Sequence, residues 1–220
     1  MNTKVLAIDT STDYLSIALL EGERVMARFH EKAEMAHSRL LVPTIRDILK
    51  KAKLRLEDMD AFAISIGPGS FTGLRIGATT VKGLSYAMNR PIVAVPTFDV
   101  IARNYKARDG IICVVLDAKK NKVYSCVYSV KKGRVKRLSG YMLVPAADLV
   151  KIIGKYGKIN YAGDGPRLLD KEAMEGIDWH PRADIAGNLA LELYNRNKVT
   201  APEDLEPLYI YSKECDITGK

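Results

Sequence analysis

The stretch AFAISIGPGSFTGLRIGATTVKGLSYAMN, residues 61–89, decides how the rest of the chain can fold. Its first six residues carry no charge, which is typical of a buried strand and too short for a helix. Gly67-Pro68-Gly69 then predicts a tight turn, because glycine permits backbone angles closed to other residues and proline fixes one more. Ser70 or Thr72 can cap the helix that follows, whose body is expected over residues 74–89.

Two glycines on that expected helix need an explanation. Gly73 and Gly77 lie four residues apart, and each costs about 1 kcal/mol relative to alanine inside a helix. Something therefore approaches the helix closely there, either a partner's helix or the chain's own sheet. A glycine-rich turn before a helix can also hold a phosphate. Neither G-x-x-x-x-G-K-[ST] nor G-x-G-x-x-G can be drawn through this stretch, so packing is the preferred interpretation.

The motif GPGSFTGLRIG at 67–77, with VLAIDTS at 5–11 and EPLYI at 206–210, resembles the TsaB (YeaZ) family. That family belongs to the bacterial machinery that makes threonylcarbamoyladenosine in tRNA, and the resemblance covers nearly the whole chain. It implies an α/β protein of two duplicated lobes, with the ribonuclease H-like sheets of the actin-like and Hsp70-like ATPase superfamily, and no catalytic site of its own.

The resemblance also implies what such a protein does. A TsaB-like chain is an accessory subunit that binds the catalytic paralogue TsaD, with the ATPase TsaE, for threonylcarbamoyl transfer to N6 of adenosine 37 of tRNAs reading ANN codons. It meets tRNA through the complex and can pair with a second copy of itself when alone. Two alternatives stay open: an active enzyme of the same fold, either a phosphotransferase or a glycoprotease-like metallopeptidase, and a stand-alone RNA-binding protein.

A duplication is visible in the sequence itself. VLAIDTSTDYLSIALL at 5–20 and CVVLDAKKNKVYSCVY at 113–128 share one pattern: a buried strand ends in an aspartate, a polar turn follows, and a second strand begins. The two aspartates, Asp9 and Asp117, lie nearly half the chain apart. We therefore expect two similar α/β lobes, residues 1–108 and 109–220.

Composition predicts an ordinary globular chain in a reducing compartment. The 220 residues are 47% hydrophobic and 27% charged, with a net charge of +8. The three cysteines form no C-x-x-C pair, and an odd number suits free thiols better than a disulfide framework. With neither a signal-peptide pattern nor a run of 18 apolar residues, the chain is expected in the cytoplasm and not in a membrane.

Two short segments match places where the ATPase superfamily holds phosphate. The first is Asp9 with Ser11 and Thr12, and the second is Gly163-Asp164-Gly165. The first lacks the superfamily's glycine, so we expect a degenerate nucleotide site, no ATP hydrolysis and no cofactor. As an alternative, Asp9 closes its strand by bonding the turn amides, and the second segment is an ordinary turn.

Histidine placement argues against a metal centre. His37 lies near the start of an amphipathic helix expected over residues 35–53, and a second ligand on that helix would be four residues away. Those positions are Ala33 and Leu41, neither of which binds metal. The family's catalytic paralogue carries a paired-histidine motif in the matching region, so we expect neither metal nor catalytic residues here.

A basic ribbon breaks the even distribution of charge. Residues 118–140 contain eight basic residues and no acid, with Tyr124 and Tyr128 between them. Basic and aromatic side chains together can hold RNA through phosphate contact and base stacking. The candidates for RNA contact are Lys131, Lys132, Arg134 and Lys136. Alternatively, the lysines belong to a solvated hairpin and keep a sheet edge from pairing.

The helices at 35–53 and 74–89 are the predicted partner interface. A side chain at either helix glycine would push a facing helix outward, and TsaB-like proteins meet their paralogue, or themselves, through first-lobe helices. The residues predicted to contact the partner are His37, Leu41, Ile45, Gly73, Leu74, Gly77 and Val81.

Overall fold

The computed structural model describes residues 2–33 and 36–210, which form two compact units. Unit 1 comprises Met1–Val100 and His180–Leu208. Unit 2 comprises Ile101–Trp179 and, beyond it, the described residues Tyr209 and Ile210. This division differs from the predicted boundary after residue 108, because the segment after residue 179 returns to the first sheet. Met35, at the start of the helix expected over residues 35–53, and Cys215 lie outside the described residues.

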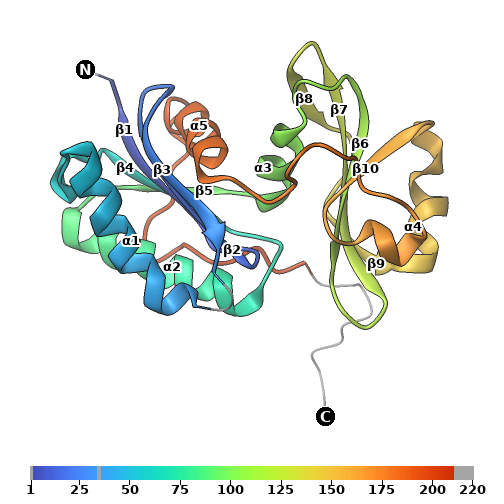
Figure 1. Ribbon diagram of the computed structural model, residues 1–220, viewed down its shortest axis with the longest axis horizontal. Helices are drawn as coiled ribbons and strands as arrows, with labels where there is room; N and C mark the ends of the chain where they lie inside the picture. The colour runs from blue at the N-terminus through green and yellow to red at the C-terminus, as the bar shows by residue number, and fades with distance from the viewer. Residues whose placement is uncertain (1, 34–35, 211–220) are drawn as a thin grey trace. The chain divides into compact units, whose positions relative to one another are not determined.

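Unit 1 is built on a five-stranded mixed sheet in the order β3-β2-β1-β4-β5 (Figure 1). The first three strands form an antiparallel meander, and β4 and β5 extend it in parallel on the other side of β1. The expected strand-turn-helix at 61–89 is confirmed as β4 followed by α2. The strands are Lys4–Asp9 (β1), Tyr14–Glu21 (β2), Arg24–Lys32 (β3), Ala61–Ser65 (β4) and Ile92–Val95 (β5).

Helices cover both faces of this sheet. On one face lie α1 (His37–Ala52) and α2 (Phe71–Met88), and on the other lies α5 (Ala183–Tyr194) (Figure 1). Side chains alternate along β1, so that Leu6 packs in the core under α1 and α2 while Val5 packs in the core under α5. The remaining elements of this part are a short 3-10 helix, Leu56–Asp58, and α3, Thr97–Asn104, which crosses from unit 1 into unit 2.

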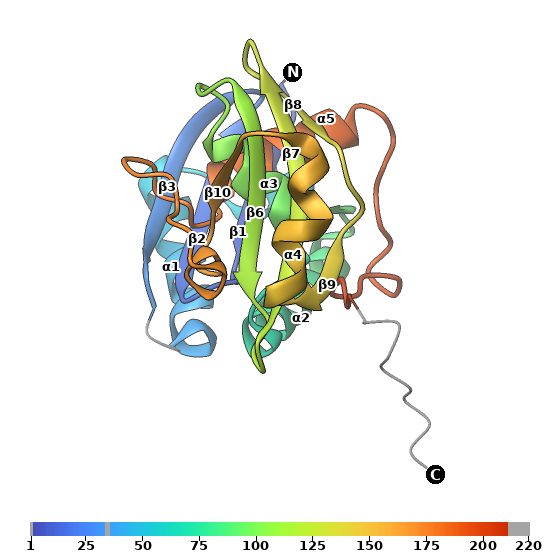
Figure 2. The ribbon, with the colours of Figure 1, turned by 90° about the vertical axis from the view of Figure 1, so that its right-hand side faces the viewer.

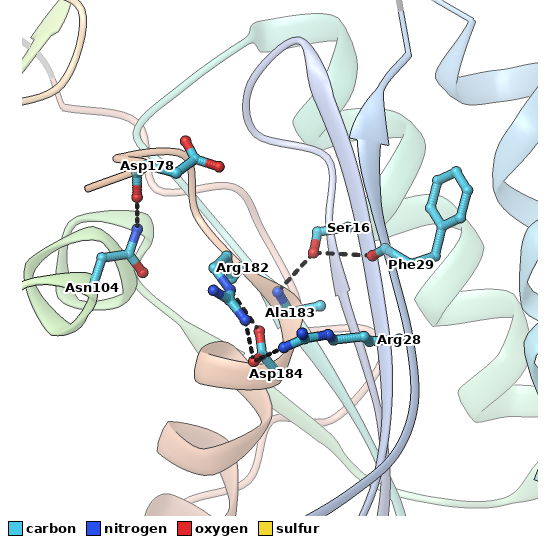
Figure 3. Close-up of polar contacts among 8 residues, drawn as sticks. All are labelled: Ser16, Arg28, Phe29, Asn104, Asp178, Arg182, Ala183 and Asp184. Carbon is cyan, nitrogen blue, oxygen red and sulfur yellow. Dashed lines mark hydrogen bonds and ion pairs between the residues drawn. The ribbon is translucent and has the colours of Figure 1, made fainter. Parts of the chain in front are cut away.

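The N-terminus of α5 is held to the sheet by polar contacts (Figure 3). The buried hydroxyl of Ser16 on β2 accepts a hydrogen bond from the Ala183 amide at 2.9 Å and donates one to the Phe29 carbonyl at 3.3 Å. Asp184 pairs with Arg182 at 2.8 Å and with Arg28 on β3 at 3.4 Å. These contacts attach a segment from the end of the chain to the first sheet.

Unit 2 repeats the plan of unit 1. Its sheet has the order β10-β6-β7-β8, so an antiparallel meander again has a parallel strand beside its first member. The short β9 pairs with β7, and α4 packs on the sheet (Figure 2). The predicted duplication of the α/β lobe is thereby confirmed. The elements are Gly110–Asp117 (β6), Lys122–Lys131 (β7), Arg134–Arg137 (β8), Met142–Pro145 (β9), Ala146–Ile153 (α4), Ile159–Ala162 (β10), and the 3-10 helices Gly154–Tyr156 (η2) and Pro166–Leu169 (η3).

No helix within the described residues is long and apolar enough to cross a membrane. The longest, α2, contains two lysine or arginine residues and several polar ones along its 18 residues. Cys113 and Cys126 are free thiols, as expected from the odd number of cysteines, and both are buried in strands of unit 2.

Candidate functional site

The turn between β1 and β2 is closed by its own side chains. One carboxyl oxygen of Asp9, Oδ1, accepts hydrogen bonds from the Ser11 amide at 2.9 Å and the Ser11 hydroxyl at 2.8 Å. The Thr12 hydroxyl accepts one from the Tyr14 amide at 3.2 Å. The Ser11 amide and hydroxyl, which could have bound a phosphate, are therefore engaged by Asp9, whereas Asp9 Oδ2 is buried without a hydrogen-bond partner among the described residues. This is the turn-closing arrangement considered for Asp9 as an alternative to a nucleotide site.

Asp9 is also cut off from solvent, with 0% of its surface exposed. Burial raises the pKa of this carboxyl to about 6, against the opposing effect of the Ser65 hydroxyl on β4 and of the Ser11 hydrogen bonds. A carboxyl with no exposed surface cannot touch a nucleotide arriving from solvent. Its observed role is to fix the end of β1.

The glycines after β4 let the next helix lie directly on that turn. A Cβ atom at Gly69 would overlap the Ser11 carbonyl, and one at Gly73 would overlap the carbonyl of Thr10. The Ser70 amide donates to the Ser11 carbonyl at 2.7 Å. The Ser70 hydroxyl caps α2 by accepting from the Gly73 amide at 3.3 Å, so Ser70 is the cap and Thr72 is not.

The structure corrects the choice of partner-contacting residues. Gly77 faces the Thr10 side chain and Ile64 of the chain's own sheet, which is the internal-packing explanation of the helix glycines. Leu41 is 1% exposed because it belongs to the core between α1 and the sheet. Burial within unit 1 holds for the whole predicted set: His37, Leu41, Ile45, Gly73, Leu74, Gly77 and Val81.

The outer faces of the same two helices carry the exposed apolar side chains instead. Val42 on α1 is 59% exposed, and on α2 Phe71 is 55% and Tyr86 63% exposed. The Arg75 guanidinium lies 3.7 Å from the centre of the Phe71 ring. Sequence reasoning missed these residues because it followed the apolar stripe that faces the core. A signal was present, since α2 contains no acidic residue and its outer positions are mostly uncharged.

The second glycine turn is closed on β6 in the same way. A Cβ atom at Gly163 would overlap the Val115 carbonyl, and the Gly165 amide donates to that carbonyl at 3.0 Å. The Asp164 carboxylate accepts from the Asp117 amide at 3.0 Å. The predicted segment Gly163-Asp164-Gly165 therefore has the contacts of an ordinary turn.

Asp117, the counterpart of Asp9, has a different environment. Its carboxylate pairs with Lys119 at 3.0 Å and with Arg167 at 3.4 Å. Partial burial opposes ionisation, but the hydrogen bonds and charge of Lys119, with Arg167, outweigh it and hold the pKa of Asp117 below its usual range. Both halves thus have an aspartate at the end of the first strand of their sheet, but Asp9 accepts hydrogen bonds from its own turn whereas Asp117 forms ion pairs.

All three histidines of the chain gather around Tyr14 in unit 1. The rings of His30 and His180 lie 5.0 and 3.9 Å from the Tyr14 ring, centre to centre. His37 Nε2 lies 3.2 Å from the Tyr14 carbonyl oxygen. Across residues 2–33 and 36–210, no three or more histidine, cysteine or acidic side chains are grouped so that they could hold a metal ion.

The basic ribbon is divided between the two ends of β7. Lys119 and Lys120 lie in the turn before this strand and Lys122 is its first residue, and the other five cations lie at the β7–β8 hairpin. Tyr128 is 2% exposed and cannot stack on a base, so the expected aromatic contribution from this residue is wrong.

Comparison with known proteins places this chain. The family model described as "TsaD: tRNA N6-adenosine threonylcarbamoyltransferase" matches residues 29–181. A Bacillus subtilis protein named tRNA threonylcarbamoyladenosine biosynthesis protein TsaB is 33% identical over 149 residues, which are 68% of this chain and 65% of that protein, just under two thirds of its length. The Escherichia coli protein of the same name is 28% identical over 218 residues, 94% of each chain.

Solved structures agree with the sequence comparison. YeaZ from Pseudomonas aeruginosa superposes with a TM-score of 0.82 at 27% identity, over 94% of this chain and 100% of that one. With the duplicated sheets, this likeness confirms the predicted fold of two duplicated α/β lobes. The chain therefore belongs to the TsaB (YeaZ) family, whose relatives compared above are named for the biosynthesis of threonylcarbamoyladenosine in tRNA.

Proposed function

We propose that this protein is a non-catalytic accessory subunit that binds the catalytic paralogue TsaD through the outer faces of α1 and α2. In this proposal the ATPase TsaE completes the cytoplasmic assembly, which transfers threonylcarbamoyl to N6 of adenosine 37 of tRNA. The same helix faces would join two copies of the chain when TsaD is absent. The names of the relatives support the pathway, and the geometry of unit 1 supports the mode of action.

The observation that carries the proposal is the outer face of α2. A surface helix usually directs charged side chains to solvent. Here the exposed positions include Phe71, Thr79, Gly83 and Tyr86. Of the two charged residues of α2, Lys82 is half-buried and Arg75 is exposed and lies over the Phe71 ring. Aromatic residues and arginine are enriched, and lysine and acids depleted, where proteins meet. This composition fits a face that another protein covers.

The turns support the non-catalytic part of the proposal. In unit 1 the carboxyl that ends β1 is buried and bonded to its own turn, and in unit 2 the turn aspartate bonds the Asp117 amide. General acid–base or nucleophilic work needs a side chain within hydrogen-bond reach of a substrate. A buried Asp9 has no such reach, and Asp117 is held by two cations of its own unit.

The test is Tyr86→Glu, with Val199→Glu as the matched control. Both residues are apolar, exposed and in unit 1, but Val199 lies outside the two helices. We expect Tyr86→Glu to weaken TsaD binding by roughly 30-fold or more, the effect of losing about 2 kcal/mol at a central contact. The control should bind normally, and both variants should melt like the wild type.

Calorimetric titration with purified TsaD paralogue and a thermal melt provide the two readouts. Unchanged affinity in the Tyr86 variant would place the partner elsewhere. Steady ATP turnover by the chain alone, on the order of 1 per second, would contradict its accessory role.

A further inference from the structure

We propose that the tip of the β7–β8 hairpin in unit 2 is a docking surface for the phosphate backbone of RNA. The basic hairpin, as we call it, consists of Lys131, Lys132, Arg134 and Lys136. All four residues are exposed. The proposal rests on two observations. The register of the two strands brings the charges together, and no described acidic side chain pairs with them.

The register brings cations together on one face. Lys131 lies directly opposite Arg134, and Lys136 lies opposite Ser129. Directly paired residues share a face of the sheet, and so do residues two apart along a strand. Lys131, Arg134 and Lys136 therefore project from the same face. Like charges directly opposite each other destabilise an antiparallel pair.

Nothing in the described structure neutralises these charges. None of the four side chains forms an ion pair with a described residue, whereas Lys32 pairs with Asp13 in unit 1. The carboxylate of Asp109 accepts from the Lys132 amide at 2.8 Å, a bond that fixes the turn. No acid occurs between residues 118 and 140. The repulsion among these cations would therefore be reduced by a negatively charged partner.

Protection of a sheet edge explains only part of this pattern. The strand β8 is an edge of the sheet, and one exposed lysine on it would discourage pairing with another chain. Lys131, however, lies at the end of β7 and pairs only with Arg134 of β8, because the pairing of β7 with β6 ends at Val130. Edge protection does not require a second cation directly opposite the first, so the pair of Lys131 and Arg134 adds a repulsion that edge protection does not explain. A local rule broken without structural gain is expected at a functional site.

The chemistry of the hairpin fits a polyanion better than a protein. The apolar residues nearest the tip on β7, Val130 and Tyr128, are 3% and 2% exposed, so no exposed aromatic anchor accompanies the cations. Protein interfaces are depleted in lysine at their centre. Phosphate contacts need only lysine and arginine, and they are independent of base sequence. The hairpin would therefore hold RNA by its backbone, without stacking.

The inference rests on the proposed function only in naming tRNA as the RNA. The test uses the full-length chain alone, fluorescently labelled unmodified tRNA transcript, and anisotropy titrations from about 50 to 200 mM salt. The variant is Lys131→Ser, Arg134→Ser and Lys136→Ser together. Lys132 is kept because its backbone shapes the turn: its φ is 50°, and its amide donates a hydrogen bond to the Asp109 carboxylate. The matched control removes three exposed cations of unit 1, by changing Arg24, Arg196 and Lys198 to serine.

We expect the hairpin variant to bind tRNA on the order of 10- to 100-fold more weakly near 0.1 M salt and to flatten the log–log salt slope by roughly 2 to 3, at about 0.7 to 0.9 per phosphate contact. The control should keep the wild-type slope, since the net charge falls equally.

Three outcomes would overturn the proposal. The first is a wild-type chain that does not bind the transcript at 50 mM salt, and the second is an unchanged slope in the hairpin variant. The third is intact RNA binding with loss of TsaD binding, which would make the hairpin a protein contact. A failure of the proposed function would be seen in a different experiment, the TsaD titration, if Tyr86→Glu bound TsaD as tightly as the wild type.

Discussion

Replacing Asp9 with asparagine should remove a pH dependence of stability that this buried carboxyl creates. Asparagine keeps an oxygen that can accept the hydrogen bonds from the Ser11 amide and hydroxyl. It carries no charge at any pH. The substitution therefore separates the cost of burying the charge from the benefit of closing the turn.

The sign follows from the direction of the pKa shift. Burial raises the pKa of Asp9 from 3.8 to about 6 in the folded protein. Between about pH 4 and pH 6 the folded state therefore binds more protons than the unfolded state, and stability falls as the pH rises. The contribution is complete below about pH 4 and is lost through about pH 6. A shift of about 2 units corresponds to about 3 kcal/mol at 1.36 kcal/mol per unit.

Urea unfolding followed by circular dichroism, at several pH values from 4 to 7.5, measures this effect. The free energy of unfolding of Asp9→Asn, relative to the wild type, should rise by about 1 to 3 kcal/mol across that range. Glu23→Gln, which removes an exposed carboxylate from the same unit, controls for the loss of one negative charge. A difference between Asp9→Asn and wild type that stays constant with pH would show that the carboxyl is not buried as described.

Two further substitutions test how unit 1 is packed. Gly73→Ala should lower the free energy of unfolding by roughly 1 to 3 kcal/mol, because its Cβ would overlap the Thr10 carbonyl. In Gly83→Ala, on the same helix, the added Cβ meets open space, so the free energy of unfolding should stay the same or rise by up to about 1 kcal/mol. Equal melting temperatures of the two variants would refute the close contact between Gly73 and the Thr10 carbonyl. Ser16→Ala should cost about 1 to 3 kcal/mol by leaving the Ala183 amide without its acceptor, whereas exposed Ser38→Ala should not change the melting curve.

Local patterns in the sequence were enough to predict the strand-turn-helix at the centre of unit 1 and the duplication. Six uncharged residues, a Gly-Pro-Gly turn and a capping serine each act within a few positions, so they can be interpreted without knowing the fold. The repeated strand-aspartate-turn-strand pattern likewise predicted two similar α/β lobes, and each lobe has a mixed sheet. Ser70 was one of two candidate caps, and only the structure distinguished it from Thr72.

The partner of each glycine could not be predicted, because the contacts are distant in sequence. The Thr10 hydroxyl donates to the Gly73 carbonyl across 63 residues, and Ala183 reaches Ser16 across 167. Spacing indicated that something approaches α2 closely but not whether it was the chain's own turn or another protein. For the same reason, the apolar stripe of α2 identified its core side and left Tyr86, on the opposite side, unnoticed.

The duplicated halves differ after their parallel strand, and this difference separates the two proposed surfaces. In unit 1, β4 leads into the 18-residue α2, whereas in unit 2 the matching β10 leads into a 3-10 helix of four residues. Only unit 1 can therefore offer a long, weakly charged helix face to a partner, and only unit 2 carries the basic hairpin. Because Tyr86 and Lys131 lie in different units, each surface can be removed while the other is kept. Tyr86→Glu should then weaken TsaD binding without changing the salt slope for tRNA. The hairpin variant should flatten that slope without changing the affinity for TsaD.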